Sequence, residues 1–299
     1  MTFTIATATY NRANVLYRVY ESLSAQTFLD FEWIIVDDGS TDNTRQVVAC
    51  WQAEAAFPIF YYYQENSGKH MALNFAVEKA EGELFVIADS DDSFRPDSLE
   101  VLLKHWNGIV PEERQYFRGV TCRCYDPETG KEIGTTFPEG VHDVLGIEAT
   151  FQYHYTFEMW GFNRTAVMKE FPFPNTAGEK LAFYPESVIW NRMGMKYKVR
   201  FVDDTLRAYY RDQGNATMHK KRNRSKENIH LWMHYVNELG KYFWCDPMRF
   251  LKAYVGLVMD GLLLGRKAGQ ILIIPKTAWG KIMTMLAFPV GFLLYLRRK

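Results

Sequence analysis

The chain has 299 residues, of which 47% are hydrophobic and 23% are charged, and this composition excludes a disordered chain. Lysine plus arginine and aspartate plus glutamate both number 35, so the formal net charge is zero. A general nucleic-acid binder would carry a basic excess, and we therefore expect no nucleic-acid partner.

The first third of the chain alternates between short apolar runs and segments with helical periodicity. The strand candidates are residues 2–8, 32–36, 58–63 and 83–88. Helical patterns lie between them, at 14–25, 44–54 and 71–80. Strands and helices in this order predict an α/β fold with a mostly parallel central sheet and helices on both faces.

The remainder of the chain has two different characters. Residues 118–215 are less regular and rich in aromatic side chains, and we expect them to complete the sheet and to form the second half of a substrate site. Residues 231–299 have a helical pattern, with breaks expected at Pro247, Pro275 and Pro289. We therefore predict a first domain at residues 1–225 and a helical C-terminal segment at 226–299.

Each strand candidate is followed by a cluster of polar residues. The clusters are residues 10–12, 37–40, 65–69 and 89–92. Ligands of parallel α/β sheets bind beyond the carboxyl ends of the strands. The four clusters therefore predict one shared site at this edge of the sheet.

Three carboxylates stand close together in Asp89-Ser90-Asp91-Asp92, directly after an apolar strand. Their mutual repulsion would raise their pKa values unless a cation neutralises them. A divalent metal ion with oxygen ligands would do so, and Mg²⁺ typically binds one or two carboxylates together with substrate phosphates. As an alternative, Asp92 or Ser93 caps a helix that begins near Pro96, but this explains one acid and not three.

Two further clusters have residue types that suit a nucleotide. Asp37 and Asp38 could accept hydrogen bonds from a base or a ribose, whereas residues 40–42 also suit a turn that caps a helix. Gly68 permits close approach of the backbone, and Lys69 at the start of a helix suits a phosphate. The segment is not a P-loop, because it lacks the glycine spacing of that motif.

Together these motifs resemble the inverting family 2 glycosyltransferases, which have the GT-A fold. The matching residues are Thr9-Tyr10-Asn11-Arg12, residues 36–42 (Val-Asp-Asp-Gly-Ser-Thr-Asp), Asn66 and Gly68 with Ala72 and Asn74, and residues 89–92 with Pro96. The resemblance covers residues 1–105 closely and extends more loosely to residue 225. It implies a nucleotide-sugar-binding half at 1–105 and an acceptor-binding half at 106–225.

The resemblance also implies roles for single residues. The contacts to the nucleotide sugar would come from Thr9, Tyr10, Arg12, Asp37, Asp38, Lys69 and Asp89. Asp89 and Asp91 resemble the Asp-x-Asp motif that binds a divalent metal ion, Mn²⁺ or Mg²⁺, with Asp91 as the more direct ligand. Related enzymes often supply a C-terminal histidine to the metal, and His219 suits this role; alternatively it is a surface histidine in a basic loop.

The catalytic base is expected near residue 186. Members of the resembled family carry Glu-Asp before a hydrophobic helix, and the aspartate deprotonates the acceptor hydroxyl. Glu186 occupies the aspartate position when Trp190 and Arg192 are kept in register, whereas Ser187 could not act as a base by itself. The base must reach the hydroxyl as an ionised carboxylate, so we predict Glu186, with Glu179 as the rival candidate.

Charge is distributed unevenly along the chain. Residues 261–299 contain seven basic and no acidic residues, which leaves 28 basic and 35 acidic residues in the first 260. The apolar run from Ile282 to Leu296 has fifteen residues, fewer than the ~20 that span a bilayer. With Lys281 and residues 297–299 beside it, the run is typical of an interfacial segment attracted to anionic lipid; alternatively, it docks on the catalytic domain.

Two further features bear on the cellular compartment. The N-terminus lacks the basic region and cleavage site of a signal peptide. The four cysteines, Cys50, Cys122, Cys124 and Cys245, do not have the spacing of a zinc site, and we expect reduced thiols. We therefore expect a cytoplasmic protein that lies peripherally on the cytoplasmic face of the membrane.

The sequence thus predicts a metal-dependent inverting glycosyltransferase of the hexosyltransferase type. Its donor would be a nucleotide-diphosphate sugar, with UDP as the default nucleotide, and its acceptor a glycan or lipid-linked glycan of the cell surface. Two alternatives are a polyprenyl-phosphate sugar transferase and, because Ser187 departs from the family pattern, a non-catalytic nucleotide-sugar-binding protein. A Rossmann-type dehydrogenase is disfavoured, since no Gly-x-Gly-x-x-Gly follows the first strand.

Overall fold

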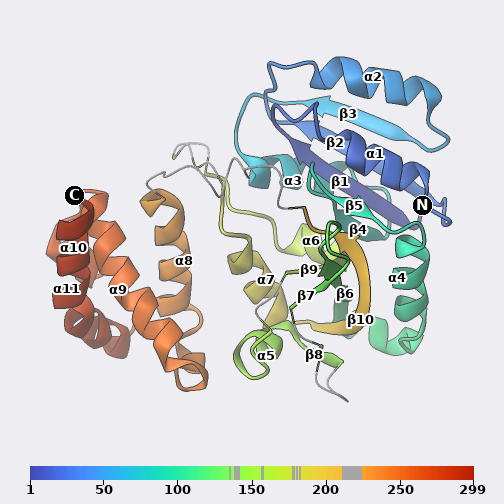
Figure 1. Cartoon of the computed structure of the whole chain (residues 1–299). Coiled ribbons are helices and arrows are strands. Elements are labelled where there is room, and N and C mark those ends of the chain that lie inside the picture. The colour runs from blue at the N-terminus through green and yellow to red at the C-terminus, as the bar shows by residue number, and fades with distance from the viewer. Residues whose placement is uncertain are drawn as a thin grey trace. The chain divides into compact units, whose positions relative to one another are not determined.

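The computed structural model of the protein describes residues 1–134, 136–137, 142–155, 158–176, 179, 181, 183–210 and 224–299. The chain divides into two compact units. The first unit is Met1–Ala177 with Ile189–His219, and the second is Gly178–Val188 with Lys220–Lys299. Figure 1 shows the helices and strands in chain order.

In the described residues of the first unit, ten strands form one sheet. They are β1 (Phe3–Thr9), β2 (Phe31–Asp37), β3 (Ile59–Tyr63), β4 (Leu84–Ile87), β5 (Ser93–Phe94), β6 (Phe117–Tyr125), β7 (Glu132–Ile133), β8 (Asp143–Leu145), β9 (Met159–Arg164) and β10 (Lys198–Ala208). The order across the sheet is β3-β2-β1-β4-β9-β6-β10-β5, and β7 and β8 pair with β6 and β10.

The two halves of the sheet differ in strand direction. Strands β3, β2, β1 and β4 are all parallel, as their alternation with helices predicts. Strand β9 is antiparallel to both of its neighbours, β4 and β6, whereas β6 and β10 are parallel. The carboxyl ends of β1, β2, β4, β6 and β10 therefore lie at the same edge of the sheet, and β9 begins there.

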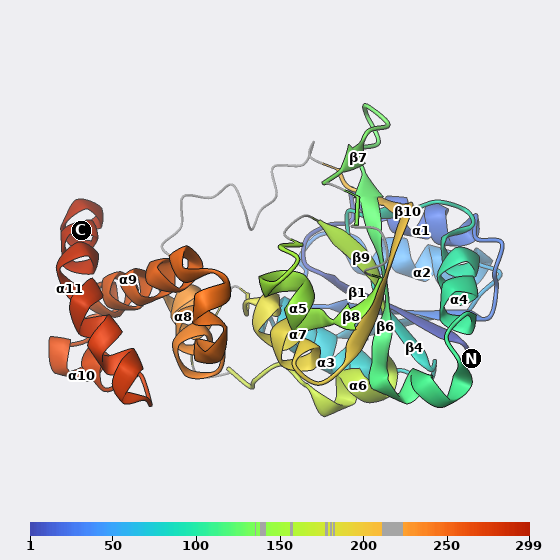
Figure 2. The same cartoon turned by 90° about the horizontal axis from the view of Figure 1, so that it is seen from below.

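Helices cover both faces of this sheet. They are α1 (Tyr17–Ser24), α2 (Thr44–Glu54), α3 (Lys69–Lys79), α4 (Ser98–Asn107), α5 (Gly146–Phe151), α6 (Thr165–Glu170) and α7 (Glu186–Gly194), with a 3₁₀ helix, η1 (Pro111–Tyr116). Helices α1, α2 and α4 lie on one face, and α3, α6 and α7 lie on the other (Figure 2). Helix α2 has the bounds that the sequence predicts, and α3 begins two residues earlier than predicted.

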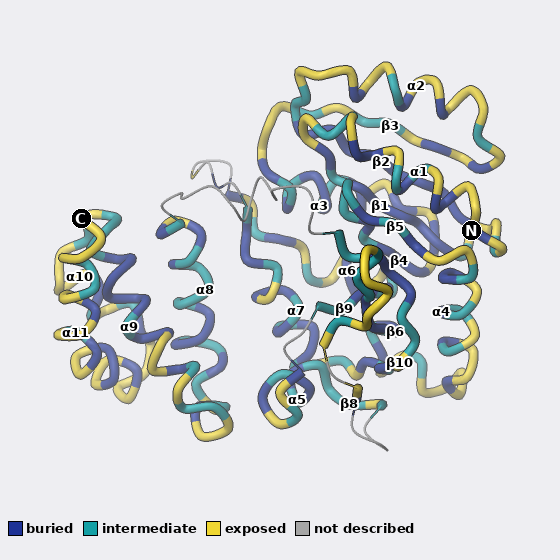
Figure 3. The backbone as a smooth tube through the Cα atoms, in the orientation of Figure 1, coloured by how far each residue is buried: buried dark blue, intermediate teal, exposed yellow. Residues whose placement is uncertain are grey.

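The core of the first unit lies between the sheet and helices α1, α2 and α4. Phe3, Leu23 and Trp106 are among its buried members. All residues of β2 are buried (Figure 3), which explains why residues 33–36 form a continuous apolar run rather than an alternating one. The indole of Trp33 in β2 donates a hydrogen bond to the Thr7 hydroxyl (2.9 Å), so its one polar atom is satisfied inside the core.

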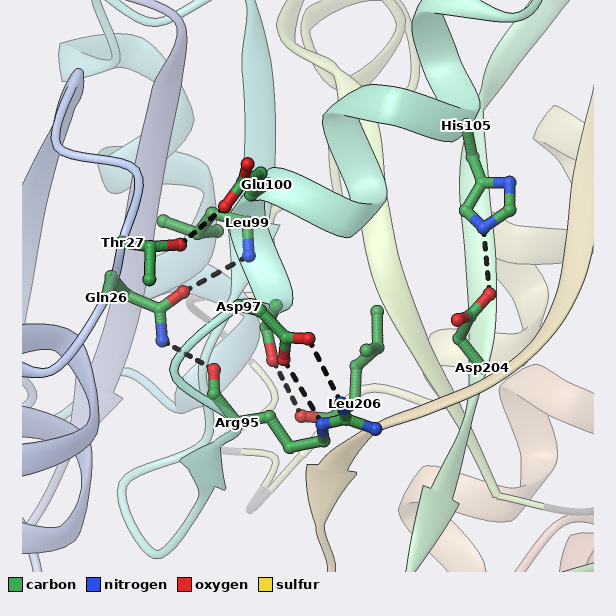
Figure 4. A network of polar contacts seen from close by, with 10 residues as sticks. Gln26, Thr27, Arg95, Asp97, Leu99, Glu100, His105, Asp204 and Leu206 are labelled. Carbon is green, nitrogen blue, oxygen red and sulfur yellow. Dashed lines mark hydrogen bonds and ion pairs between the residues drawn. The ribbon is translucent and has the colours of Figure 1, made fainter.

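The segment between the acidic motif and α4 is fixed on two sides (Figure 4). Arg95 N donates to the carbonyl of Leu206 in β10 (3.0 Å). The side chain of Gln26 donates to the carbonyl of Arg95 (2.8 Å) and accepts from Leu99 N (3.1 Å). The chain that follows Asp92 is therefore held against the carboxyl end of β10.

The second unit consists mainly of helices. They are α8 (Ser225–Asn237), α9 (Pro247–Leu263), α10 (Ala268–Leu272) and α11 (Ala278–Arg298), with a 3₁₀ helix, η2 (Gly240–Cys245). Helices α8 and α9 are joined by a buried carboxylate: Asp260 accepts from the Ser225 hydroxyl and from the Trp232 indole, both at 2.7 Å. These two bonds satisfy an acid that is fully buried.

Two of the three proline breaks expected in this region occur. Pro247 is the first residue of α9, where its missing N–H costs no hydrogen bond, and Pro275 lies between α10 and α11. The break expected at Pro289 is wrong, because α11 continues through it. Pro289 is exposed, and so is Met285, whose carbonyl loses its N–H partner, so solvent can take the place of that hydrogen bond.

Candidate functional site

The loops that follow β1 and β2 are joined through Asn11. Its side-chain oxygen accepts hydrogen bonds from Thr41 N (2.8 Å) and Asp42 N (3.2 Å), and its own N–H donates to the Ser40 hydroxyl (2.8 Å). Asn11 has a φ of 52°, in the left-handed region that asparagine tolerates better than most residues. The Tyr10–Arg12 and Asp37–Ser40 clusters therefore form one connected surface.

Asp38 joins the loop after β2 to the loop after β3. Its buried carboxylate accepts from Ser67 N (2.8 Å), Gly68 N (2.9 Å) and the Gln64 side chain (2.6 Å). Gly68 has a φ of 93°, a conformation that disfavours residues with a Cβ, and it is followed directly by α3. Asp38 thus fixes the position of Lys69, the first residue of that helix.

Asp37 is also buried and has its own internal partners. Its carboxylate accepts from Ser40 N (2.7 Å) and from the Tyr61 hydroxyl (2.6 Å). Burial together with this bond to a carboxylate raises the pKa of Tyr61. In this structure Asp37 and Asp38 therefore stabilise the loops, and the base and ribose contacts expected of them stay a prediction.

The acidic motif after β4 receives cations from the first and third loops. Lys69 Nζ lies 2.6 Å from Asp89 Oδ1, and Arg12 Nη2 lies 3.8 Å from Asp91 Oδ2. Asp38, Lys69, Asp89, Asp91 and Arg12 are thus joined by a chain of contacts at one edge of the sheet. The sequence predicts this convergence.

Arg207, the second-last residue of β10, contacts the acidic motif, and the sequence reasoning missed it. Its side chain is 7% exposed. The guanidinium lies 2.8 Å from Asp92 Oδ1, 3.0 Å from Glu158 Oε1 and 3.7 Å from Asp89 Oδ2. An arginine is rarely this buried unless it is paired. No local signal could have identified it, because β10 also carries Lys198, Arg200, Asp203 and Asp204.

These cations change the electrostatics that the sequence suggests for the motif. Although burial disfavours ionisation of Asp89, Lys69 and Arg207 outweigh it and hold the pKa of Asp89 below its ordinary value. Burial raises the pKa of Asp92 to about 8, with Asp89 and Asp91 contributing and Arg207 opposing. Repulsion within the motif is therefore offset in part by protein cations, and a metal ion is not needed for that purpose alone.

The three aspartates differ in their availability to a metal ion. Asp92 is buried, lies against Arg207 and accepts a hydrogen bond from Asp89 N (2.9 Å), so it holds the loop in shape. Asp91 and Asp89 are only partly buried. The described residues contain no group of three or more His, Cys, Asp or Glu that could hold a metal ion. Two carboxylates are too few to hold a metal ion by themselves. They fit a metal ion whose remaining ligands are phosphate oxygens of a substrate.

The other expected contacts to the nucleotide sugar lie at the end of β1. Thr9 is buried, and its hydroxyl has no hydrogen-bond partner within the described part of the chain. Tyr10 is half exposed and presents an aromatic ring beside Asn11. Such a ring suits stacking against a flat base.

The candidates for the base belong to the second unit. Glu186 is the first residue of α7. Its rival Glu179 has a carboxylate oxygen 2.8 Å from His230 Nε2. His219, the third expected metal ligand, lies outside the described residues.

Comparison with known proteins identifies relatives of the N-terminal region. The model of the family described as glycosyl transferase family 2 matches residues 4–110. An uncharacterized glycosyltransferase of Nostoc sp. is 38% identical over 104 residues, which are 35% of this chain and 32% of that protein. The putative teichuronic acid biosynthesis glycosyltransferase TuaG of Bacillus subtilis is 35% identical over 100 residues, 33% of this chain and 40% of TuaG. The match thus spans about a third of each relative.

Solved structures resemble the whole chain. Residues 1–349 of S. aureus TarS, in complex with UDP-GlcNAc, have a TM-score of 0.66 and 17% identity, over 100% of this chain and 93% of that one. The mannosyltransferase PcManGT from Pyrobaculum calidifontis, in complex with GDP-Man and Mn²⁺, has a TM-score of 0.54 and 19% identity, over 99% and 87%. At such identities the likeness concerns the fold alone, and it confirms the fold predicted from the sequence.

Proposed function

Because residues 4–110 of this chain belong to glycosyl transferase family 2, we propose that the protein transfers a sugar from a nucleotide-diphosphate donor to a glycan or lipid-linked acceptor. The observation that carries the proposal is the set of contacts that joins Asp38, Gly68 and Lys69 to Asp89 at one edge of the sheet. This edge is where α/β sheets bind their ligands, and its residue types suit a nucleoside diphosphate.

The donor half of the site would use groups that the loops hold in place. Lys69 stands at the start of α3, where backbone N–H groups and the helix dipole favour an anion, and its ammonium would bind the diphosphate. The carboxylates of Asp91 and Asp89 would hold a divalent metal ion together with the donor phosphates, and this ion, when bound, supplies a Lewis acid for the departing diphosphate. Tyr10 would stack against the base, and the Thr9 hydroxyl would bind the nucleotide.

Glu186 is the proposed base. Its carboxylate would take the proton of the acceptor hydroxyl while that oxygen bonds to the anomeric carbon and the bond from this carbon to the diphosphate oxygen breaks. A single displacement inverts the configuration at that carbon. Glu179 stays the rival candidate, and one of its oxygens lies 2.8 Å from His230 Nε2.

The choice of substrates rests on the relatives. TuaG is named for teichuronic acid biosynthesis, which supports a cell-surface polysaccharide as the product to which this chain contributes. TarS has been solved with UDP and with UDP-GlcNAc, which supports UDP as the nucleotide. PcManGT has been solved with Mn²⁺, which supports a divalent cofactor.

The test measures metal-dependent release of UDP from a panel of UDP-sugars, with and without candidate acceptors. Donor binding is measured separately by thermal shift, since a ligand at 100 times its Kd stabilises by about 2.7 kcal/mol. We expect Asp91→Asn to abolish the metal-dependent shift. We expect Glu186→Gln to keep the donor-induced shift but to lower kcat by roughly 100- to 10,000-fold, the range of a lost general base.

Glu179→Gln is the matched control for the base, because it makes the same chemical change in the same unit. It should leave kcat within about threefold of wild type. Turnover that survives both Asp91→Asn and Glu186→Gln would overturn the site assignment. A donor-induced shift without turnover in wild type, for any acceptor, would favour the non-catalytic binding protein instead.

A further inference from the structure

Helix α11 has an apolar side that is open to solvent. Its large apolar residues on this side are each between 42% and 68% exposed: Trp279, Ile282, Met285, Leu286, Val290, Phe292, Leu293 and Leu296. They recur at intervals of three or four residues, so they form one stripe along the helix. A stripe of this length on a soluble surface marks a site of contact with an apolar partner.

The opposite side of α11 packs closely against the rest of the second unit. Its buried residues are Gly280, Met283, Thr284, Ala287 and Gly291. A Cβ added to Gly291 would lie 2.6 Å from Val258 Cβ and 3.0 Å from the carbonyl of Val255, both in α9. The backbones of α9 and α11 therefore touch, and α11 cannot leave α9 without exposing the buried side of both helices.

This packing bears on how α11 could meet a membrane. Within the described chain, α11 is the one helix whose length and composition would let it cross a bilayer, and most of it is not buried. A crossing helix would have to carry α9 into the bilayer, and α9 contains the buried, hydrogen-bonded Asp260 and begins next to Asp246 and Arg249. An orientation in the plane of the surface keeps these groups out of the hydrocarbon.

Charge identifies the partner. Six of the seven cations of this region are exposed, and residues 261–299 contain no Asp or Glu. The six are Lys267, Lys276, Lys281, Arg297, Arg298 and Lys299. A second copy that presented the same face would bring like charges together, which disfavours a symmetric dimer. An anionic lipid surface offers both an apolar interior and the opposite charge.

Aromatic residues extend the apolar stripe of α11. Trp244 is 80% exposed and Trp279 is 47% exposed, and the rings of both contact Phe243, with centroids 5.0 and 5.9 Å apart. Tryptophan is enriched where a bilayer meets water, because its ring is apolar and its N–H is polar. We propose that α11 lies in the surface of an anionic lipid bilayer, with its Ile282–Leu296 stripe among the acyl chains and its cations at the head groups.

The test is a flotation assay of the full chain with two kinds of vesicle. One contains phosphatidylcholine alone, and the other contains phosphatidylcholine with 30% phosphatidylglycerol. We expect binding to the second kind, at least tenfold weaker binding to the first, release by 0.5 M salt or alkaline carbonate, and at least a tenfold loss in the double variant Leu286→Glu/Leu293→Glu. The matched control is Leu29→Glu/Val110→Glu, which adds two charges at exposed apolar residues of the first unit and should change binding less than twofold.

Circular dichroism of both double variants shows whether they remain folded. A variant with Lys281, Arg297 and Arg298 changed to Gln tests the contribution of charge to vesicle binding and leaves the apolar stripe unaltered. Equal binding to both kinds of vesicle, or unchanged binding of Leu286→Glu/Leu293→Glu, would overturn the proposal. Protein that stays in the vesicles after carbonate would indicate a spanning helix and would also overturn it. So would a dimer in sedimentation analysis that the same double variant converts to a monomer, since the face would then bind a second copy. None of these readouts uses transferase activity, so the proposal stands or falls separately from the proposed function.

Discussion

Replacing Arg207 by methionine should destabilise the first unit more than the same change at a surface arginine. Methionine keeps much of the side-chain volume and removes the charge. Asp92, whose side chain is 4% exposed, would then lose a guanidinium at 2.8 Å, and Asp89 would lose one of the cations that lower its pKa. Because burial raises the pKa of Asp92 to about 8, its carboxyl can take up a proton at pH 7 and does not stay as an uncompensated charge. The expected cost is that of a buried polar group left without its hydrogen-bond partner, about 1–3 kcal/mol. We expect a loss of this size in the free energy of unfolding at pH 7.

Arg200 supplies the control, since it lies on the same strand and also pairs with an aspartate. Its partner is Asp143, and the two side chains are 22% and 35% exposed. An exposed pair contributes about 0–1 kcal/mol, so Arg200→Met should cost at most that much. Urea unfolding followed by circular dichroism gives both values under the same conditions. Arg207→Met/Asp92→Asn should recover about 1 kcal/mol of the loss, since it also replaces the Asp92 carboxyl that the single variant leaves without its partner. Equal costs for Arg207→Met and Arg200→Met, or strict additivity in the double variant, would refute the reasoning.

Two further predictions concern local strain and thiol reactivity. Gly39→Ala should lower the free energy of unfolding by about 1–3 kcal/mol, because Gly39 has a φ of 89° and the added Cβ would lie 3.0 Å from Asn66 N. Gly130→Ala should cost less, because Gly130 has a φ of 67° and nothing lies within 4 Å of its added Cβ. A larger drop in melting temperature for Gly130→Ala than for Gly39→Ala would contradict the role of the contact with Asn66. In the native protein, Ellman's reagent at pH 8 should modify the exposed Cys50 and Cys245 quickly, and it should reach Cys122 and Cys124 only after unfolding, because burial raises the pKa of Cys122 well above its ordinary value and that of Cys124 to about 12. Rapid modification of all four cysteines would show that Cys122 and Cys124 in β6 are not protected by burial.

The N-terminal half could be predicted from the sequence because each of its local signals agrees with the global fold. A strand, a polar cluster and a helix repeat there, and parallel strands necessarily bring their carboxyl ends to one edge. The convergence of Lys69 on Asp89 follows from that rule alone. The sequence could not show that Asp37 and Asp38 accept hydrogen bonds from their own loops, since a carboxylate that holds a loop and one that awaits a ligand have the same residue type.

Arg207 shows where sequence reasoning ended and why. It is more than 100 residues from Asp89 along the chain, and two strands, β9 and β6, separate its strand β10 from β4 in the sheet. The direction of β9 decides where β6 and β10 run, and no local pattern in residues 159–164 reveals that direction. The prediction of a helix break at Pro289 was wrong for a different reason. Whether a proline breaks a helix depends on whether solvent reaches the backbone carbonyl that the proline leaves without an N–H partner.

The reversed direction of β9 has a consequence for how this architecture can diversify. In the parallel half of the sheet, the residues at the edge with the polar clusters are those that follow a strand. Because β9 runs in the opposite direction, the residues that precede it lie at that same edge. Glu158, directly before β9, contacts Arg207 from there. Apart from Glu158, substitutions just before β9 can therefore reach that edge without changing the loops that follow β1, β2 or β4. Under the proposed function, such changes would alter the contacts to the acceptor and leave the loops that contact the donor in place.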